Sequence, residues 1–197
     1  MPSSPVSNLP AGLLWAETFW KDRLGGRLPG GTIAALPEAV ILGLIARRET
    51  VATAESCTGG LAAKLATDTP GASAAFHLGV VAYDNEVKER LLKVSGKTLE
   101  KFGAVSELCV REMASGVMKL RPRATYALAI SGVAGPDGGA PDKPVGAVWM
   151  ALATPDGSTA ECFHFPGDRD AVRLAAAYSA FGMLWEHLTR KEGANGG

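Results

Sequence analysis

The stretch VATAESCTGGLAAKLA, from Val51 to Ala66, decides the fold class of this sequence. Its first residues form a short apolar run typical of a buried strand, and its last residues have the composition of a helix. The paired Gly59 and Gly60 between them allow the backbone to turn sharply. A strand that leads through a tight turn into a helix is the repeating unit of an α/β protein, so we expect that fold class.

The same alternation of strand-like and helix-like segments continues along the rest of the sequence. A turn of Pro155, Asp156 and Gly157 joins the last two apolar segments, which predicts a hairpin. Together the segments predict a three-layer α/β/α sandwich on a mixed, mostly parallel sheet with one antiparallel hairpin strand. We expect further strands at 75–83, 125–131, 147–154 and 158–165, and helices at 32–49, 85–94, 106–120 and 168–190.

The length of 197 residues fits one domain with an additional segment. Residues 1–31 are rich in Pro, Gly and Ser, and we expect them to form a partly flexible N-terminal appendage. Their aromatic patch, LLWAETFW, is expected to pack on the domain or on a second subunit rather than to bind a ligand. The main domain is then expected at 32–190, followed by a flexible tail at 191–197.

Composition excludes several classes of function. Lysine plus arginine and aspartate plus glutamate both number 20, which gives zero formal charge, so we expect no nucleic-acid partner. The apolar stretches are shorter than the roughly 20 residues that span a bilayer, and the N-terminus lacks the layout of a signal peptide. We therefore expect a cytoplasmic protein without membrane contact. Its three cysteines and three histidines are scattered, which predicts neither a disulfide framework nor a metal site.

The turn after the first strand is the first candidate site. Open α/β folds bind ligands at the carboxyl edge of the sheet, and Ser56 and Thr58 fall at that edge. Gly59 and Gly60 leave backbone amides at the start of a helix for an anion or a developing oxyanion. The alternative is that Ser56 and Thr58 only cap the helix, as these residue types often do. Glu55 is expected to make a structural hydrogen bond to a nearby loop.

The segment YDNEVKERL, which starts at Tyr83, is the second candidate site. Lys88 falls close to the N-terminus of the helix expected there, where the helix dipole disfavours a protonated ammonium, and burial would lower its pKa further. A lysine of low pKa can act as a base. The alternative is a solvated lysine paired with Glu89 or Asp84 on an exposed helix face.

A long loop rich in glycine and proline, ISGVAGPDGGAPDKPVG, is the third candidate site. It joins two buried strands, which is typical of loops that hold ligands, and Ser131 and Gly132 repeat the hydroxyl and glycine of the first site. The alternative is a plain surface connection.

The segment GDRDAVR at the start of the last helix is the fourth candidate site. Arg169 and Arg173 lie one turn apart on the same side of that helix and could hold a phosphate or a carboxylate. The alternative is a set of surface ion pairs with Asp170 and its neighbours.

Taken together, these segments resemble the CinA C-terminal family, the nicotinamide-nucleotide amidases, over about residues 35–190. The resemblance rests on TAESCTGGL, GVVAYDNEVKERLL, GAVSE, SGVAGPDGG, KPVG and GDR in this order and spacing. It implies hydrolysis of nicotinamide mononucleotide to nicotinate mononucleotide and ammonia. It also implies a homodimer that binds a small-molecule nucleotide and needs no cofactor.

The resemblance further implies roles for single residues. Ser56 corresponds to the nucleophile, Lys88 to its base, and Tyr83 to a catalytic neighbour of both. Backbone amides near Gly59 would hold the oxyanion. The positions that correspond to substrate-binding residues are Thr58, Gly59, Gly60, Asn85, Ser131, Gly132 and Arg169.

The sequence departs from the family pattern at two positions. Ser131 stands where threonine is more common, and it keeps the hydroxyl. Asp84 stands where a small hydroxyl residue is common, and its charge would raise the pKa of Lys88 unless the carboxylate points to solvent. Two alternatives therefore stay open: a catalytically silent nucleotide-binding or competence- and damage-related regulatory module, and thiol chemistry through Cys57.

Overall fold

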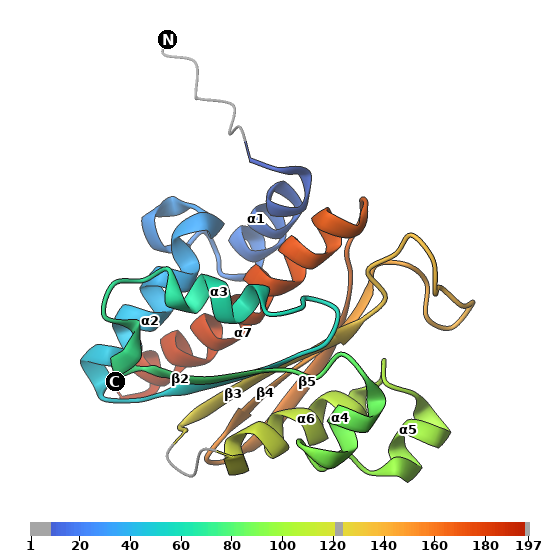
Figure 1. The fold of residues 1–197 in the computed structure, drawn as a ribbon. Coiled ribbons are helices and arrows are strands. Elements are labelled where there is room, and N and C mark those ends of the chain that lie inside the picture. The colour runs from blue at the N-terminus through green and yellow to red at the C-terminus, as the bar shows by residue number, and fades with distance from the viewer. Residues whose placement is uncertain (1–8, 121–123, 196–197) are drawn as a thin grey trace.

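The computed structural model describes residues 9–120 and 124–195, and it is built around one five-stranded sheet (Figure 1). The strands lie in the order β2–β1–β3–β4–β5, with β2 and β5 at the edges. Residues 1–8 of the expected appendage and 196–197 of the expected tail lie outside the described residues. The strands are β1 (Val51–Glu55), β2 (Phe76–Val81), β3 (Tyr126–Gly132), β4 (Ala147–Thr154) and β5 (Gly157–His164).

The sheet is mixed, and β1 is parallel to both of its neighbours. It pairs in parallel with β2 and β3, whereas β4 runs antiparallel to β3 and to β5. The mixed sheet and the β4–β5 hairpin confirm the prediction from sequence. The pairings between the described strands divide evenly into parallel and antiparallel, however, so the sheet is less parallel than predicted.

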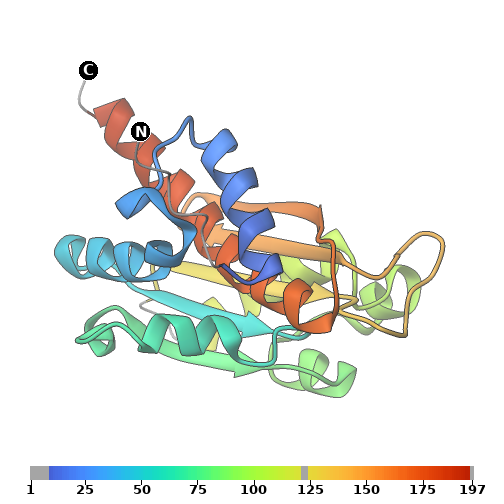
Figure 2. The same cartoon turned by 90° about the horizontal axis from the view of Figure 1, so that it is seen from above.

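Helices cover both faces of the sheet (Figures 1 and 2). Alternation along β3 explains this layering, because Tyr126, Leu128 and Ile130 belong to the core under one set of helices. Ala127 and Ala129 belong to the core under the other set, where their small side chains let a helix approach closely. On the first face lie α1 (Ala11–Arg23), α2 (Leu36–Arg47), α3 (Leu61–Thr67) and α7 (Arg169–Asn195), and on the second α4 (Asn85–Arg90), α5 (Gly96–Phe102) and α6 (Glu107–Leu120).

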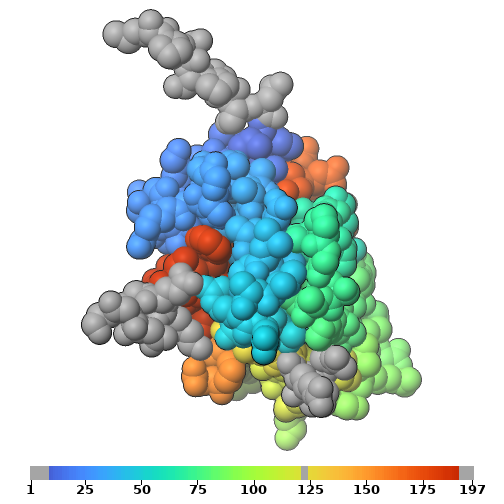
Figure 3. All heavy atoms as spheres, turned by 90° about the vertical axis from the view of Figure 1, so that its left-hand side faces the viewer, coloured from blue at the N-terminus to red at the C-terminus, as the bar shows by residue number. Residues whose placement is uncertain are grey.

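The N-terminal helix α1 packs along α7 and belongs to the main hydrophobic core (Figure 2). Trp20 is fully buried, and its indole N–H donates to Ser179 Oγ at 2.9 Å. A Cβ at Gly12 would meet the backbone of Ala171, so only glycine allows this close approach of the two helices. In the space-filling view, the blue N-terminal segments lie directly against the red atoms of α7 (Figure 3). The aromatic patch thus packs on the domain, which is one of the two expected outcomes.

The largest departure from the predicted elements lies between β2 and α6. The helix predicted at 85–94 ends at Arg90, and α5 follows it. The chain leaves α4 with Lys93 at a φ of 59°, in the left-handed region, and Val94 N–H then donates to the Lys88 carbonyl at 3.1 Å. Lysine is rarely found in this conformation, so the apolar pattern of the segment predicts a longer helix than the chain forms.

Among residues 9–120 and 124–195, no helix has the length and apolar character that crossing a membrane requires. The same residues contain no group of three or more His, Cys, Asp or Glu side chains arranged to hold a metal ion.

Candidate active site

The carboxyl ends of β1, β2 and β3 meet at one edge of the sheet, and Ser56 lies between them. Its N–H donates to the carbonyl of Ile130 in β3 at 2.9 Å. The carbonyl of Glu55, at the end of β1, accepts from Ala82 N–H just after β2 at 2.8 Å. The first three candidate segments therefore meet at the edge where open α/β folds bind ligands.

Glu55 organises the turn that follows Ser56. Its carboxylate is fully buried and accepts hydrogen bonds from this turn and from the start of α3. The structural hydrogen bond expected of Glu55 is therefore present, and it fixes the connection between β1 and the next helix. The donors are Thr58 Oγ1 at 2.7 Å, Gly60 N at 3.1 Å, Ala62 N at 3.0 Å, Ala63 N at 2.8 Å and Thr53 Oγ1 at 3.3 Å.

The turn residues Thr58, Gly59 and Gly60 have partners within the protein. Thr58 is fully buried and its hydroxyl donates to Glu55, so the cap of α3 is the Glu55 carboxylate and not a hydroxyl of the turn. The two glycines have φ values of 62° and 95°, as the sharp turn requires. The sequence predicts free amides at both, but Gly59 N–H donates to Ser56 O at 3.1 Å and Gly60 N–H donates to Glu55. Substrate contact stays a prediction for all three residues.

Two other peptide N–H groups of the turn remain available. Within the described residues, the N–H groups of Cys57 and Thr58 donate to no oxygen atom. Both N–H groups point toward the sulfur of Cys57, which is only a weak hydrogen-bond acceptor. A peptide N–H directly after a nucleophilic residue is a common oxyanion donor. Cys57 and Thr58 are therefore better candidates for this role than the glycines.

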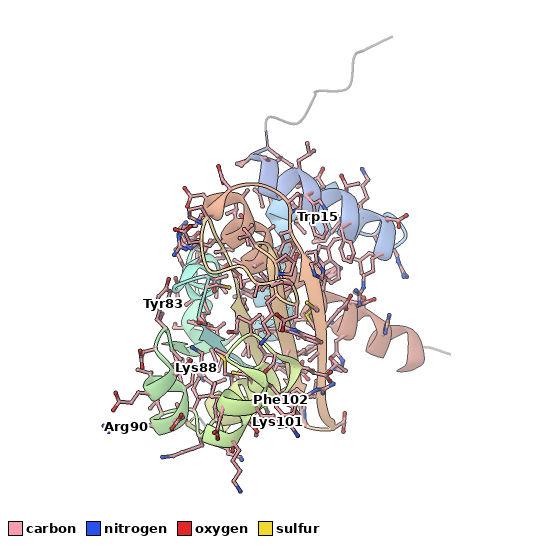
Figure 4. The ribbon with its side chains drawn as sticks, turned by 90° about the vertical axis from the view of Figure 1, so that its right-hand side faces the viewer. Trp15, Tyr83, Lys88, Arg90, Lys101 and Phe102 are labelled. Carbon is pink, nitrogen blue, oxygen red and sulfur yellow. The ribbon has the colours of Figure 1, made fainter. Side chains whose placement is uncertain are left out.

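Lys88 is buried, with 1% of its surface exposed, and its ammonium nitrogen donates to Tyr83 O at 3.2 Å (Figure 4). Burial lowers the pKa of Lys88 below the ordinary value of 10.5, and the nearby Cys109 and Asp84 oppose this shift only in part. The alternative of a solvated lysine on an exposed helix face is therefore wrong.

The hydroxyl of Ser56 is the other half of the predicted pair. Ser56 is partly exposed, and within the described residues its hydroxyl makes no hydrogen bond. Lys88 instead bonds to Tyr83 O. Catalytic hydrogen bonds are often long in the absence of substrate and tighten only in the complex. The structure brings Ser56 and Lys88 to one edge of the sheet, and a direct contact between them stays a prediction.

Asp84 and Asn85 begin α4 at the rim of the site. Asp84 is exposed and caps the helix, because its Oδ1 accepts from Glu86 N–H at 2.7 Å. A carboxylate that faces solvent raises the pKa of Lys88 less than a buried one would. Asn85 is exposed as well, and its contact with a substrate stays a prediction.

Arg169 connects three segments of the site. Its Nη2 donates to the Tyr83 hydroxyl at 3.1 Å, and its Nη1 donates to the carbonyl of Gly135 at 2.9 Å. Tyr83 is 62% exposed, so this link lies at the surface. The first turn of α7 thereby joins the end of β2 to the glycine-rich loop.

Arg173, one turn further along α7, contacts a different part of the site. Its Nε donates to Cys57 O at 3.2 Å, and its Nη2 donates to Thr58 O at 3.0 Å. The predicted ion pair with Asp170 is also present, at 3.7 Å. The sequence shows that both arginines face one side of α7, but nothing in it indicates that one of them holds the nucleophile turn.

Ser131 and Gly132 mainly shape the start of the glycine-rich loop. Ser131 is 1% exposed, and its hydroxyl donates to the Ala104 carbonyl at 2.8 Å. A Cβ at Gly132 would lie 2.6 Å from Val148 Cγ2 and 2.7 Å from Ala147 O, so only glycine fits beside β4. Their predicted contact with a substrate stays a prediction.

Cys57 is a poor candidate for a nucleophile. Burial raises the pKa of its thiol to about 12, so the thiol stays protonated at neutral pH. Burial likewise raises the pKa of Cys109, the other cysteine near Lys88, to about 11. The thiolate is the reactive form of cysteine, and this environment disfavours it.

Known proteins match the segments that build this site. The family model of the CinA C-terminal domain matches residues 33–188. The nicotinamide-nucleotide amidohydrolase PncC of Escherichia coli K12 is 53% identical over 156 residues, which is 78% of this chain and 93% of that protein. A CinA-like protein of an Anaeromyxobacter species is 52% identical over 76% of this chain and 36% of its own length. This chain thus corresponds to one part of that longer relative.

Solved structures give the same result. A crystal structure of a CinA superfamily protein from Klebsiella pneumoniae is 38% identical and aligns with a TM-score of 0.77 over 81% of this chain and 99% of its own. The competence/damage inducible protein of Agrobacterium tumefaciens is also 38% identical, with a TM-score of 0.76 over 78% of this chain and 94% of its own. From the family model, the sequence identities and the shared fold, the chain belongs to the CinA C-terminal domain family.

Proposed function

We propose that this protein hydrolyses the carboxamide of nicotinamide mononucleotide, giving nicotinate mononucleotide and ammonia, with Ser56 as nucleophile and Lys88 as its base. The observation that carries the proposal is the buried Lys88 of lowered pKa at the same sheet edge as Ser56. The 53% identity to a nicotinamide-nucleotide amidohydrolase supports the choice of substrate.

The chemistry follows from these two side chains. A neutral Lys88 takes the Ser56 proton while Oγ forms a bond to the carboxamide carbon. The carbonyl oxygen becomes an oxyanion, which the N–H groups of Cys57 and Thr58 stabilise. The C–N bond then breaks, the leaving nitrogen takes the proton back from Lys88, and ammonia departs. Water releases nicotinate mononucleotide from Ser56 with Lys88 again as base.

The rim of the site supplies groups for the rest of the substrate. Arg169 is exposed and could exchange its bonds to Tyr83 and Gly135 for a phosphate, whose oxygens a guanidinium binds in a bidentate manner. Asn85 offers an amide at the same rim.

We also propose that the protein is a cytoplasmic homodimer, on the ground of its resemblance to the family. Light scattering after size-exclusion chromatography tests the dimer.

Release of ammonia from nicotinamide mononucleotide by the purified protein tests the proposal. Turnover is expected to fall by roughly 10³-fold or more in Ser56→Ala, because no nucleophile remains. It is expected to fall far less in Cys57→Ala, which keeps the peptide N–H. Loss confined to the Cys57 variant would assign the chemistry to the thiol. Thermal stabilisation by the nucleotide without any ammonia release would instead support a silent binding module.

A further inference from the structure

Arg173 holds the nucleophile turn by its backbone. Two nitrogens of one planar guanidinium donate to two consecutive carbonyls, those of Cys57 and Thr58. The side chain is partly buried, with 31% of its surface exposed, and it reaches across from α7 to a segment more than a hundred residues away in the sequence. A Cβ on Gly59 would lie 3.3 Å from Arg173 Nη2, so the glycine leaves room for this contact.

Holding a carbonyl also fixes the direction of the next N–H. The peptide unit is planar and trans, so the carbonyl of Cys57 and the N–H of Thr58 point in opposite directions. Because Arg173 holds the carbonyl, the Thr58 N–H points away from the guanidinium. It lies toward the Cys57 sulfur. The free N–H of Thr58 therefore lies on the side of its peptide unit opposite to Arg173.

The carboxylate of Glu55 acts on the same turn in the complementary way. It accepts from Thr58 Oγ1 and Gly60 N–H, whereas Arg173 donates to the two carbonyls. Within the described residues, the polar backbone groups left without an oxygen partner include the N–H groups of Cys57 and Thr58. These are the donors that an oxyanion needs.

We propose that Arg173 is a positioning residue for the Thr58 N–H as an oxyanion donor, and that it does not bind the substrate phosphate. This inference rests on the proposed function, in which Ser56 attacks an amide. Donors that are already oriented stabilise the transition state without reorganisation, and their effect appears in kcat rather than in KM. A phosphate-binding arginine would act mainly on KM.

The test compares Arg173→Lys with the wild-type protein in ammonia release from nicotinamide mononucleotide. Lysine keeps the charge but has a single donor nitrogen, which cannot hold both carbonyls in a fixed plane. We expect kcat to fall by about 10- to 100-fold, somewhat less than the loss of a complete oxyanion donor, with KM within about twofold. A rise in KM with unchanged kcat would overturn the inference and assign Arg173 to substrate binding.

Asp170→Asn is the matched control. Asp170 is the ion-pair partner of Arg173, and its side chain is 91% exposed, so the substitution removes a charge beside Arg173 without touching either carbonyl contact. Its kcat is expected to equal that of the wild type. A loss of kcat in Asp170→Asn as large as that in Arg173→Lys would show that the loss does not come from the two carbonyl contacts, and would overturn the positioning role.

A second measurement separates this inference from the proposed function. A fluorophosphonate probe reacts with an activated serine and places its phosphoryl oxygen where an oxyanion forms, and mass spectrometry gives the rate at which Ser56 is labelled. Slower labelling in Arg173→Lys than in the wild type supports the inference, even if the protein releases no ammonia from nicotinamide mononucleotide. Labelling at the wild-type rate overturns it, as does a wild-type protein whose Ser56 is not labelled.

Discussion

The Glu55→Gln substitution tests how strongly one buried carboxylate holds the turn that carries the nucleophile. Glutamine has nearly the same shape as glutamate, but it replaces one oxygen by an NH₂ group that can only donate. Oε2 of Glu55 accepts three hydrogen bonds, and Oε1 accepts from Ala63 N–H at 2.8 Å and from Thr53 Oγ1 at 3.3 Å. If the glutamine oxygen takes the Oε2 position, its NH₂ group faces the Ala63 N–H, and two donors oppose each other.

The size of the effect follows from these contacts. A buried N–H left without an acceptor costs about 1–3 kcal/mol, and three charge-assisted bonds that become neutral lose about 1 kcal/mol each. Relief from burying a charge offsets part of this sum. We therefore expect the free energy of unfolding to fall by about 3 kcal/mol, a large share of the roughly 5–15 kcal/mol that stabilises a typical domain.

Urea unfolding followed by tryptophan fluorescence and circular dichroism measures this change. Glu100→Gln serves as the control, because Glu100 is exposed on α5 and a surface substitution of this kind should change stability by no more than about 0.5 kcal/mol. If Glu55→Gln also stays within about 1 kcal/mol of the wild type, Glu55 does not organise the turn in the way that its contacts indicate.

Four further outcomes are expected. The kcat for ammonia release should rise with pH and level off below 10.5, because burial lowers the pKa of Lys88 and only its neutral form is a base. The same shift makes the folded protein gain stability as pH rises from the lowered pKa of Lys88 to 10.5, since the unfolded chain then binds more protons, and urea unfolding across that range measures it. Gly132→Ala should cost about 2 kcal/mol in urea unfolding, because its Cβ overlaps Val148. Trp20→Ala should cost about 3–5 kcal/mol in the same assay, through a cavity and the lost bond to Ser179.

Sequence periodicity predicts most strands and helices of this fold, because apolar residues repeat with the period of the element that buries them. It fails at Lys93, whose left-handed conformation ends the segment after α4 without a glycine to indicate it. It also overstates the parallel character of the sheet. The glycine-rich loop turns back from β3 into the adjacent β4, which therefore runs antiparallel to β3, and apolar spacing does not encode this direction.

The site was predictable where its chemistry is local and less so where distant segments meet. Ser56 and Lys88 each stand in a strand-to-helix segment that the sequence identifies, and the burial of Lys88 agrees with the low pKa that a base requires. The sequence predicts free amides at Gly59 and Gly60, because it does not show that Ser56 and Glu55 accept from them. The hydrogen bonds from Arg173 to the turn depend on the packing of α7, which only the folded chain reveals.

The docking of α1 has a consequence for protein production. The family model begins at residue 33, yet aromatic rings of α1 lie against the edge strand and its continuation: Trp15 is 4.9 Å from Phe165, and Phe19 is 5.6 Å from Phe163, between ring centroids. A gene shortened to the family boundary would encode a protein whose edge strand exposes phenylalanine side chains to water. Exposed apolar surfaces of this kind promote aggregation. The expression boundary for this protein should therefore be placed before α1, whatever the extent of its homology.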